Sequence, residues 1–228
     1  MDLEEPVFQD RRDAGRQLAK ELAAYRNRND VVVLALPRGG VPVAFEVARE
    51  LGAPLDVFCV RKLGAPGQAE LAIGAIASGG VTVMNEDVLR MLRLTAQDVE
   101  AAAAYEAAEL EQSEREYRGA APGVEVAGRT AIVVDDGLAT GATMRAAVKA
   151  LWQRNAAKVV AAVPVGAPRS CQDLEELVNQ LICLYRPEQF RAVGEWYHDF
   201  SQTTREEVSR LLRKGNRNFG RNVTQVLQ

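Results

Sequence analysis

The chain has 228 residues, of which 47% are hydrophobic and 26% are charged, and its formal net charge is −3 at pH 7. This length suits one domain of ordinary size, and the apolar fraction excludes intrinsic disorder. A charge so close to zero gives no reason to expect nucleic acid or an acidic membrane as a partner. Three separated cysteines and a single histidine exclude a disulfide framework and the common zinc motifs.

The sequence contains no recognisable targeting or membrane segment. The first residues, Met1 to Pro6, are acidic and lack an apolar stretch, so no secretory signal is expected. No apolar run reaches the roughly 18 to 20 residues that a membrane helix needs. We therefore expect a soluble, cytoplasmic protein with no membrane partner.

Short apolar runs alternate with helical patterns along most of the chain. Helices are expected over residues 10–24, 41–51 and 141–154, and apolar runs that predict buried strands cover residues 31–36, 55–60, 131–134, 158–163 and 181–184. Strands separated by helices of this length form right-handed βαβ units. The sequence therefore predicts an α/β fold with a doubly wound, mainly parallel sheet of five strands.

Two segments break this alternation. Residues 63–85 are rich in glycine and other small residues, and a hairpin is expected at Gly79 and Gly80. Residues 95–118 lack glycine and proline and predict one long, largely solvated helix with mainly acidic charges. Neither segment requires a domain boundary. We expect a single domain over residues 1–228, with its core at about 10–184 and residues 63–118 as an insertion.

The most informative stretch begins where the third apolar run ends. Asp135 and Asp136 follow that run, and a turn of small residues, 137–143, leads into the next helix. Small residues let the backbone approach a ligand, and the first N–H groups of a helix attract an anion. Carboxylates beside such a turn would repel phosphate unless a group lies between them. A sugar phosphate meets this condition, because its hydroxyl groups can face the acids.

Two other interpretations of this stretch fit less well. It is not a P-loop, since the lysine of that motif is missing. A receiver-like or flavodoxin-like signalling domain would carry its acidic pair after the first strand rather than beyond the middle of the chain.

The stretch resembles the motif that binds 5-phosphoribosyl-1-pyrophosphate (PRPP) in type I phosphoribosyltransferases. The resemblance implies that Asp135 and Asp136 hold the ribose hydroxyl groups and, together with PRPP oxygens, a Mg²⁺ ion. It also implies that the turn binds the 5′-phosphate. The PRPP-binding residues implied in this way are Arg38, Gly39, Gly40, Lys62, Asp135, Asp136, Gly137, Leu138, Ala139, Thr140, Gly141, Ala142 and Thr143.

Two basic segments match the same family in order. Leu36 to Gly40 resembles the pyrophosphate loop, in which the family often has a non-proline cis peptide bond. With the family's strand order, 3-2-1-4-5, Arg38 lies opposite the acidic pair at the switch point of the sheet. Lys62, after the second strand, is expected to reach pyrophosphate too. Arg38, Lys62, Asp135 and Asp136 thus form the expected catalytic set, although either cation could simply be a surface residue at a strand end.

The small-residue segment after Lys62 resembles the mobile loop that closes over the active site in this family. Closure matters because water would otherwise attack the activated sugar carbon. Glu70, within this segment, is a candidate proton carrier.

Residues 190–200 resemble the hood of purine phosphoribosyltransferases, and a hood is expected at about 185–204. In this interpretation Trp196 or Tyr197 stacks on the acceptor base and Asp199 accepts a hydrogen bond from it. The alternative is that both aromatic residues belong to the core or to an interface. Ala139 stands where hypoxanthine-guanine enzymes have a further aspartate, so the acceptor base is not assigned.

The resemblance therefore implies a Mg²⁺-dependent, homodimeric phosphoribosyltransferase of purine type, as in purine salvage. It would transfer the phosphoribosyl group of PRPP to a nucleobase-like nitrogen acceptor and release pyrophosphate. A non-catalytic sensor of PRPP or nucleotides on the same fold is the alternative. The basic tail, residues 205–228, could contact RNA, but a frayed, solvated terminal helix is the preferred interpretation.

Overall fold

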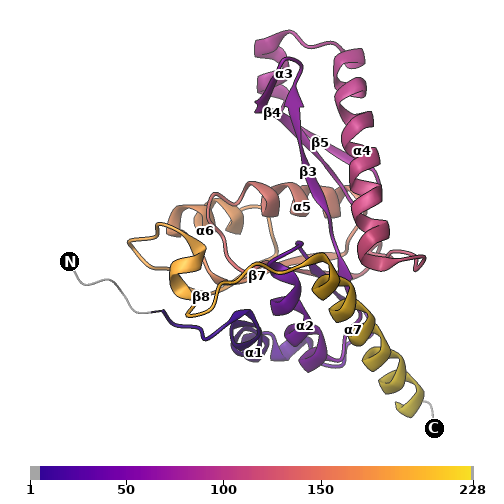
Figure 1. Ribbon diagram of the computed structural model, residues 1–228, viewed down its shortest axis with the longest axis vertical. Helices are drawn as coiled ribbons and strands as arrows, with labels where there is room; N and C mark the ends of the chain where they lie inside the picture. The colour runs from indigo at the N-terminus through magenta and orange to yellow at the C-terminus, as the bar shows by residue number, and fades with distance from the viewer. Residues whose placement is uncertain (1–5, 227–228) are drawn as a thin grey trace.

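The computed structural model describes residues 6–226, with only the backbone at residues 69 and 218 and from residue 220 onward. Five parallel strands form the central sheet in the order β2-β1-β6-β7-β8 (Figure 1). The strands are β1 (Val31–Ala35), β2 (Leu55–Val57), β6 (Thr130–Val134), β7 (Lys158–Val165) and β8 (Gln180–Tyr185). Every residue of β1, β2 and β6 is buried, because both faces of the sheet are covered. The predicted doubly wound, five-stranded α/β fold is confirmed.

The strand order differs in one respect from the order that the family resemblance implies. Numbered along the chain, the strands of this sheet lie in the order 2-1-3-4-5 rather than 3-2-1-4-5. The difference arises because the chain does not add a further strand to the sheet after β2, and the run 55–60 is not one strand. Only Leu55–Val57 pairs with β1, and after Phe58 and Cys59 the chain leaves the sheet as β3 (Val60–Ala65). The pairing of β1 with β6, on which the site depends, is as predicted.

Helices pack on both faces of the sheet and bury alternate residues of its strands. On one face, α1 (Arg11–Glu21), the short 3-10 helix Ala23–Tyr25, α2 (Gly40–Leu51) and α7 (Arg205–Val226) form a core with Val31 and Val33. On the other face, α5 (Ala142–Gln153) and α6 (Pro168–Glu175) pack with Val32 and Leu34. The predicted helices 10–24, 41–51 and 141–154 agree with α1, α2 and α5 to within a few residues, whereas α6 was not predicted.

An arm projects from this body between β2 and β6 (Figure 1). We use the name arm for residues 60–118, which comprise β3, β4 (Gln68–Ala77), β5 (Val81–Met84), α3 (Glu86–Leu92) and α4 (Ala96–Arg118). The three strands form an antiparallel sheet, β3-β4-β5. The hairpin expected at Gly79 and Gly80 is confirmed, with φ values of 86° and 75°, and so is the long helix. The segment expected to be a mobile loop is instead largely strand, because β3 pairs with β4 along its length.

The C-terminal helix is more firmly packed than the sequence suggested. Val208, Leu211 and Leu212 are buried between α7 and its neighbours α2 and α4, so this part of α7 belongs to the core rather than to a frayed tail. Arg221, one of the basic residues of the predicted tail, lies outside the described side chains. Between β8 and α7, the expected hood holds only a short 3-10 helix, Val193–Trp196.

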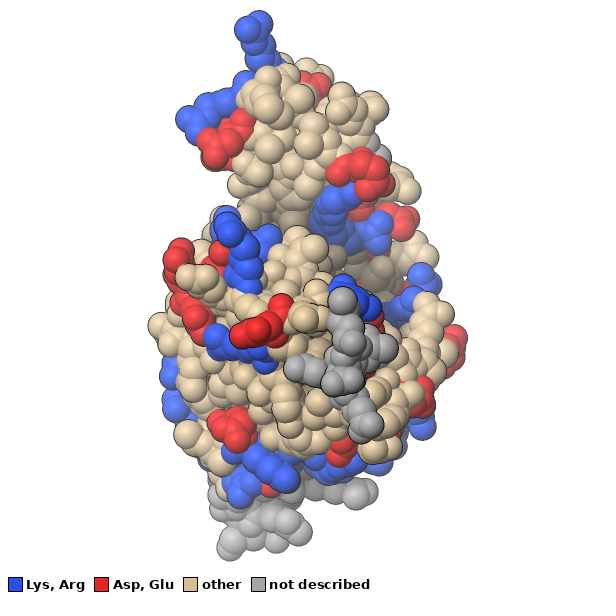
Figure 2. Space-filling model, turned by 90° about the vertical axis from the view of Figure 1, so that its left-hand side faces the viewer, with Lys and Arg blue, Asp and Glu red and all other residues tan. Residues whose placement is uncertain are grey.

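The charged surface is mixed. Figure 2 shows Lys and Arg side chains interspersed with Asp and Glu side chains over both the arm and the body on the visible face, and the molecule narrows between the two parts. Among residues 6–226, no helix has the length and the apolar character that crossing a membrane requires.

Candidate active site

The structure brings the loop after β1 against the acids after β6. The two strands pair in parallel up to Ala35 and Val134, so the loops that follow them start side by side. A β-carbon on Gly39 would lie 2.0 Å from an Asp136 carboxylate oxygen, and one on Gly40 would lie 2.7 Å from the Val134 carbonyl oxygen. Only glycine allows this approach. The loop also contains a non-proline cis peptide bond, between Pro37 and Arg38.

Asp136 is held by a residue that the sequence analysis did not identify. The Nε of Arg11, at the start of α1, donates to Asp136 Oδ2 at 2.8 Å, and both side chains are largely buried, at 11% and 15% exposure. Arg11 Nη1 donates to the Ser201 carbonyl oxygen at 2.7 Å, and the guanidinium lies 3.8 Å above the centre of the Phe200 ring. No local signal marks Arg11, because it is 125 residues away from Asp136 in the sequence.

Asp135 lies in a different electrostatic environment from Asp136. Burial, and then the negative charge of Asp136, raise the pKa of Asp135 well above its ordinary value. Its Oδ1 accepts a hydrogen bond from the Asp136 backbone N–H at 2.9 Å. The two carboxyl groups therefore differ in their partners: Asp136 has a cationic partner, whereas Asp135 accepts from a backbone amide.

The turn 137–143 has the form of an anion cradle. Leu138 is buried and fixes the turn through a backbone hydrogen bond to Val165, and Ser170 Oγ donates to the Ala139 carbonyl oxygen at 2.6 Å. Gly141 has a φ of 71° and precedes α5. Within residues 6–226, the N–H groups of Ala139, Thr140 and Gly141 have no intramolecular acceptor. The turn thus leaves backbone donors free at the start of a helix, where an anion is favoured.

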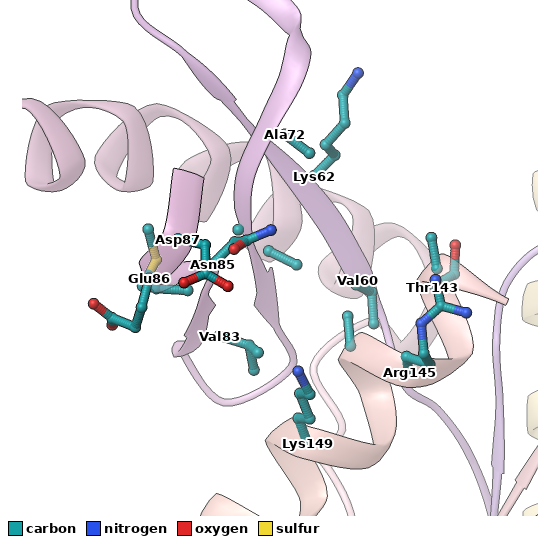
Figure 3. Close-up of a pocket in the computed structure, with 15 residues that line it drawn as sticks. Val60, Lys62, Ala72, Val83, Asn85, Glu86, Asp87, Thr143, Arg145 and Lys149 are labelled. Atoms are coloured by element: carbon teal, nitrogen blue, oxygen red, sulfur yellow. The ribbon is translucent and has the colours of Figure 1, made fainter. Parts of the chain in front are cut away.

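Lys62 lies on the arm rather than beside the acids. Its Nζ donates to the carboxylate of Glu70 at 3.1 Å, and Glu70, the candidate proton carrier, is fully exposed. Lys62 lines a cleft of about 680 Å³ between the arm and α5, together with Ala142 and Thr143 of the turn. Figure 3 shows Thr143, Arg145 and Lys149 of α5 across from Val60, Val83 and Asn85 of the arm, with the Lys62 ammonium group pointing away from α5.

The hood residues lie differently from the arrangement that the sequence suggested. Trp196 and Tyr197 are only 5% and 4% exposed and belong to a cluster with Phe8 and Val165, so neither ring offers a free face to a base as placed here. The Tyr197 hydroxyl donates to the Asp136 carbonyl oxygen at 2.5 Å and so supports the acid pair.

Asp199 is engaged in a local turn, because its Oδ1 accepts a hydrogen bond from the Ser201 N–H at 2.9 Å. This hydrogen bond lowers the pKa of Asp199. His198 is exposed. Phe200 lies against the guanidinium of Arg11, the residue that pairs with Asp136.

The acid pair fits a magnesium ion only if a ligand completes the coordination. Within residues 6–226 there is no cluster of three or more His, Cys, Asp or Glu side chains suited to a metal. Mg²⁺ is commonly bound by one or two carboxylates together with substrate phosphate oxygens. Asp135 and Asp136 supply that number of carboxylates, beside a cradle for the phosphate of a ligand.

Comparison with known proteins relates this chain to a family profile, to curated proteins and to a solved structure. The family profile "Phosphoribosyl transferase domain" matches residues 8–74 and 59–195. Two Mycobacterium tuberculosis proteins, from strains H37Rv and CDC 1551, are provisionally named phosphoribosyl transferases; each is 46% identical over 213 residues, which are 93% of this chain and 48% of the relative. The chain thus spans about half the length of these curated relatives. The crystal structure of TT1426 from Thermus thermophilus is 42% identical, with a TM-score of 0.82, over 91% of this chain and 98% of that one.

Proposed function

Because the chain belongs to the phosphoribosyl transferase domain family, we propose that it transfers the 5-phosphoribosyl group of PRPP to a nucleobase-like nitrogen acceptor. One observation supports this most directly: Gly39 and Gly40 let the loop that carries Arg38 touch the Asp135–Asp136 pair. Ribose hydroxyl groups at the acids, a phosphate in the turn and pyrophosphate at Arg38 would then occupy one continuous site.

In this reaction the bond from the sugar C1 to pyrophosphate breaks, and a bond from C1 to the acceptor nitrogen forms. The acceptor nitrogen loses a proton to water or to the released pyrophosphate, and the positive charge that develops on the sugar is matched by negative charge that grows on pyrophosphate. Arg38 and Lys62 would stabilise the leaving group, and the acids would orient the ribose. The free N–H groups of residues 139–141 would hold the 5′-phosphate and so fix the sugar in the site.

Mg²⁺, when bound, would neutralise charge on pyrophosphate, with Asp135 and Asp136 holding it together with PRPP oxygens. Lys62 must approach the body for its part, and the cleft in Figure 3 is the space that the arm would close. In this proposal the arm, rather than the expected mobile loop, closes over the site.

The proposed acceptor follows from the family resemblance and from the hydrogen-bonding groups of the hood. A base of purine type, as in salvage, fits the family resemblance, and Asp199 is an exposed hood carboxylate that could accept a hydrogen bond from it. Tyr197 supports the acid pair from the core through its hydroxyl, and Trp196 packs in the same cluster; either ring would stack on a base only after a rearrangement of the hood. The proposal includes a homodimer of two copies of this chain. Light scattering after size-exclusion chromatography would test it by measuring the molar mass in solution.

Pyrophosphate release tests the proposed reaction. The protein is incubated with PRPP and Mg²⁺ and with a panel of purines, pyrimidines and nicotinate-like acceptors, and thermal stability is measured with PRPP alone. At a PRPP concentration one hundred times Kd, the free energy of unfolding should rise by about 2.7 kcal/mol. Release that depends on an acceptor would support the transferase and identify its substrate class. Stabilisation without release would favour the PRPP sensor. The absence of both stabilisation and release would refute the assignment of the site.

A further inference from the structure

Arg11 holds the carboxylate that the proposed function assigns to the ligand. Its Nε donates to Asp136 Oδ2 at 2.8 Å, and only 11% of its side chain and 15% of that of Asp136 are exposed. Water therefore screens this ion pair less than it screens a pair at the surface.

Two further contacts fix the guanidinium. Arg11 Nη1 donates to the Ser201 carbonyl oxygen at 2.7 Å, and the guanidinium carbon lies over the Phe200 ring, 3.8 Å from its centre. The Ser201 carbonyl oxygen and the Phe200 ring therefore hold the Arg11 guanidinium independently of Asp136.

A carboxylate oxygen held in this way is poorly available to a metal ion. A divalent cation that bound Asp136 Oδ2 would have to displace the Arg11 donor, and one that approached Oδ1 would be repelled by the charge of Arg11. The carboxyl group without a cationic partner is that of Asp135, and a single carboxylate binds Mg²⁺ or Mn²⁺ weakly without phosphate oxygens.

We propose that Arg11 is the resident counter-ion of Asp136: it competes with a divalent cation for this carboxylate and keeps the empty acid pair from binding metal. The inference rests on the proposed function, because it concerns the same two acids. Arg11 acts as a positioning residue. When a metal ion arrives with PRPP, Arg11 gives up Asp136 but stays on Ser201 and Phe200.

Mn²⁺ binding without PRPP tests this proposal, since Mn²⁺ replaces Mg²⁺ and free Mn²⁺ is measured directly by electron paramagnetic resonance. Arg11→Met should bind Mn²⁺ about tenfold more tightly than the wild type, because one nearby positive charge is removed. Adding Asp136→Asn should abolish the gain. Arg12→Met is the matched control, because Arg12 is the next residue on α1 and pairs with Glu207, at 4.0 Å, rather than with either acid of the site; its Mn²⁺ affinity should equal that of the wild type.

Arg11→Lys separates charge from shape, since it keeps a cation near Asp136, and its Mn²⁺ affinity should stay near that of the wild type. Circular dichroism checks that each variant is folded, and Arg11→Gln takes the place of Arg11→Met if the latter is not. An unchanged Mn²⁺ affinity in a folded Arg11→Met or Arg11→Gln variant would overturn the proposal. Failure of the proposed function would be seen differently, as wild-type protein that neither binds PRPP nor releases pyrophosphate.

Discussion

Gly39 is the residue on which the contact between the two loops of the site depends most. A methyl group there would lie 2.0 Å from Asp136 Oδ2 and 3.3 Å from Arg11 Nε, so the ion pair and the loop would have to move apart. We expect Gly39→Ala to lower the free energy of unfolding by about 1–3 kcal/mol, as overpacking does. It should also abolish stabilisation by PRPP. Urea unfolding and a PRPP-dependent thermal shift measure the two effects.

Gly123→Ala is the control for this substitution. A β-carbon on Gly123 meets its nearest atom, on Arg118, at 3.5 Å, which is an ordinary contact. The unfolding free energy of this variant should stay within about 0.5 kcal/mol of the wild type, and PRPP should stabilise it normally. If Gly39→Ala behaved like Gly123→Ala, the close approach of the loops would not matter for binding.

Asp135 makes stability depend on pH. Burial and the charge of Asp136 raise its pKa well above the ordinary value of 3.8. The folded protein then binds more protons than the unfolded chain in the interval between the two pKa values, so ionisation of Asp135 costs stability as the pH rises. We expect Asp135→Asn, measured by urea unfolding in the presence of a chelator, to be more stable than the wild type at neutral pH. The difference should shrink as the pH falls below about 4.

Asp30 is a control, because its pKa is shifted in the opposite direction from that of Asp135. A hydrogen bond from Arg28 lowers the pKa of Asp30 to about 2. Its stabilising effect is present above the ordinary pKa and is lost as the pH falls through the folded value. Asp30→Asn should therefore lower stability at neutral pH, by a small amount because the pair is exposed. A wild-type protein that is more stable than Asp135→Asn at neutral pH would contradict the assignment for Asp135.

At the residue scale, the sequence predicted those site residues that belong to short, contiguous motifs. The acid pair, the small-residue turn and the glycines after Arg38 are all short motifs, and the structure brings them together at adjacent strand ends. Arg11 was not predictable in the same way, since its partner lies 125 residues further along the chain. The sequence left two interpretations of Trp196 and Tyr197 open, because an aromatic pair looks the same in a core and in a binding pocket, and the structure buries both side chains.

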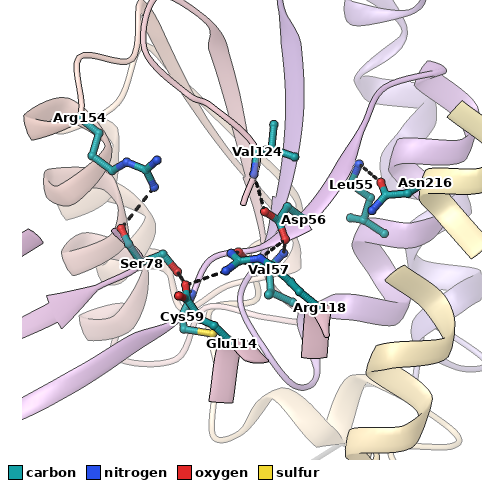
Figure 4. Close-up of polar contacts among 10 residues, drawn as sticks. All are labelled: Leu55, Asp56, Val57, Cys59, Ser78, Glu114, Arg118, Val124, Arg154 and Asn216. Carbon is teal, nitrogen blue, oxygen red and sulfur yellow. Dashed lines mark hydrogen bonds and ion pairs between the residues drawn. The ribbon is translucent and has the colours of Figure 1, made fainter. Parts of the chain in front are cut away.

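At the scale of elements, a buried polar network fastens the arm to the body (Figure 4). Arg118, at the end of α4, donates to the Asp56 carboxylate at 2.6 Å and to the Val57 carbonyl oxygen at 2.7 Å, and it pairs with Glu114 at 3.0 Å. Asp56 also accepts from the Val124 N–H, and Ser78, at the turn between β4 and β5, donates to Glu114. The network thus joins α4 and the β4–β5 turn to the end of β2.

Arg118→Ala tests this attachment. It would leave Asp56 and Glu114 buried without their cation, which costs about 3–5 kcal/mol. Hydrogen exchange should speed up in β3, β4 and β5 more than in β1 and β6. Arg115→Ala on the same helix is the control, because the Arg115–Glu111 pair is 67% exposed on both sides and should contribute less than about 1 kcal/mol. Equal effects of the two variants would rule out a special role for the network.

The elements that were predicted and those that were missed differ in their physical signal. β1, β6 and β7 are continuous apolar runs because they are buried on both faces, and α4 has no helix-breaking residue over its length. β3 and β4 contain several alanine and glycine residues, which are depleted in strands, so the sequence predicted a loop where these two strands pair. The packing of α7 was missed because its buried Val208, Leu211 and Leu212 lie among many exposed charges.

At the scale of the whole molecule, the proposed site is divided between two parts of the protein. The acids, the turn 137–143 and Arg38 belong to the body, whereas Lys62 belongs to the arm, across the cleft in Figure 3. Binding of PRPP must therefore draw the arm toward the body if Lys62 takes part. The strong polar attachment at Arg118 makes the base of the arm the fixed point of such a movement.

Hydrogen exchange with and without PRPP and Mg²⁺ would reveal this coupling. We expect protection to rise in two separated segments, the turn 137–143 and the strands β3 and β4, because the ligand bridges the body and the arm. In Lys62→Met the turn should still be protected, whereas the gain in β3 and β4 should be lost, since this variant lacks only the arm cation that the proposal brings to pyrophosphate. Lys149→Met, which alters an exposed cation on the α5 side of the same cleft, should keep both gains. Protection confined to the turn in the wild type would show that the arm takes no part in binding PRPP.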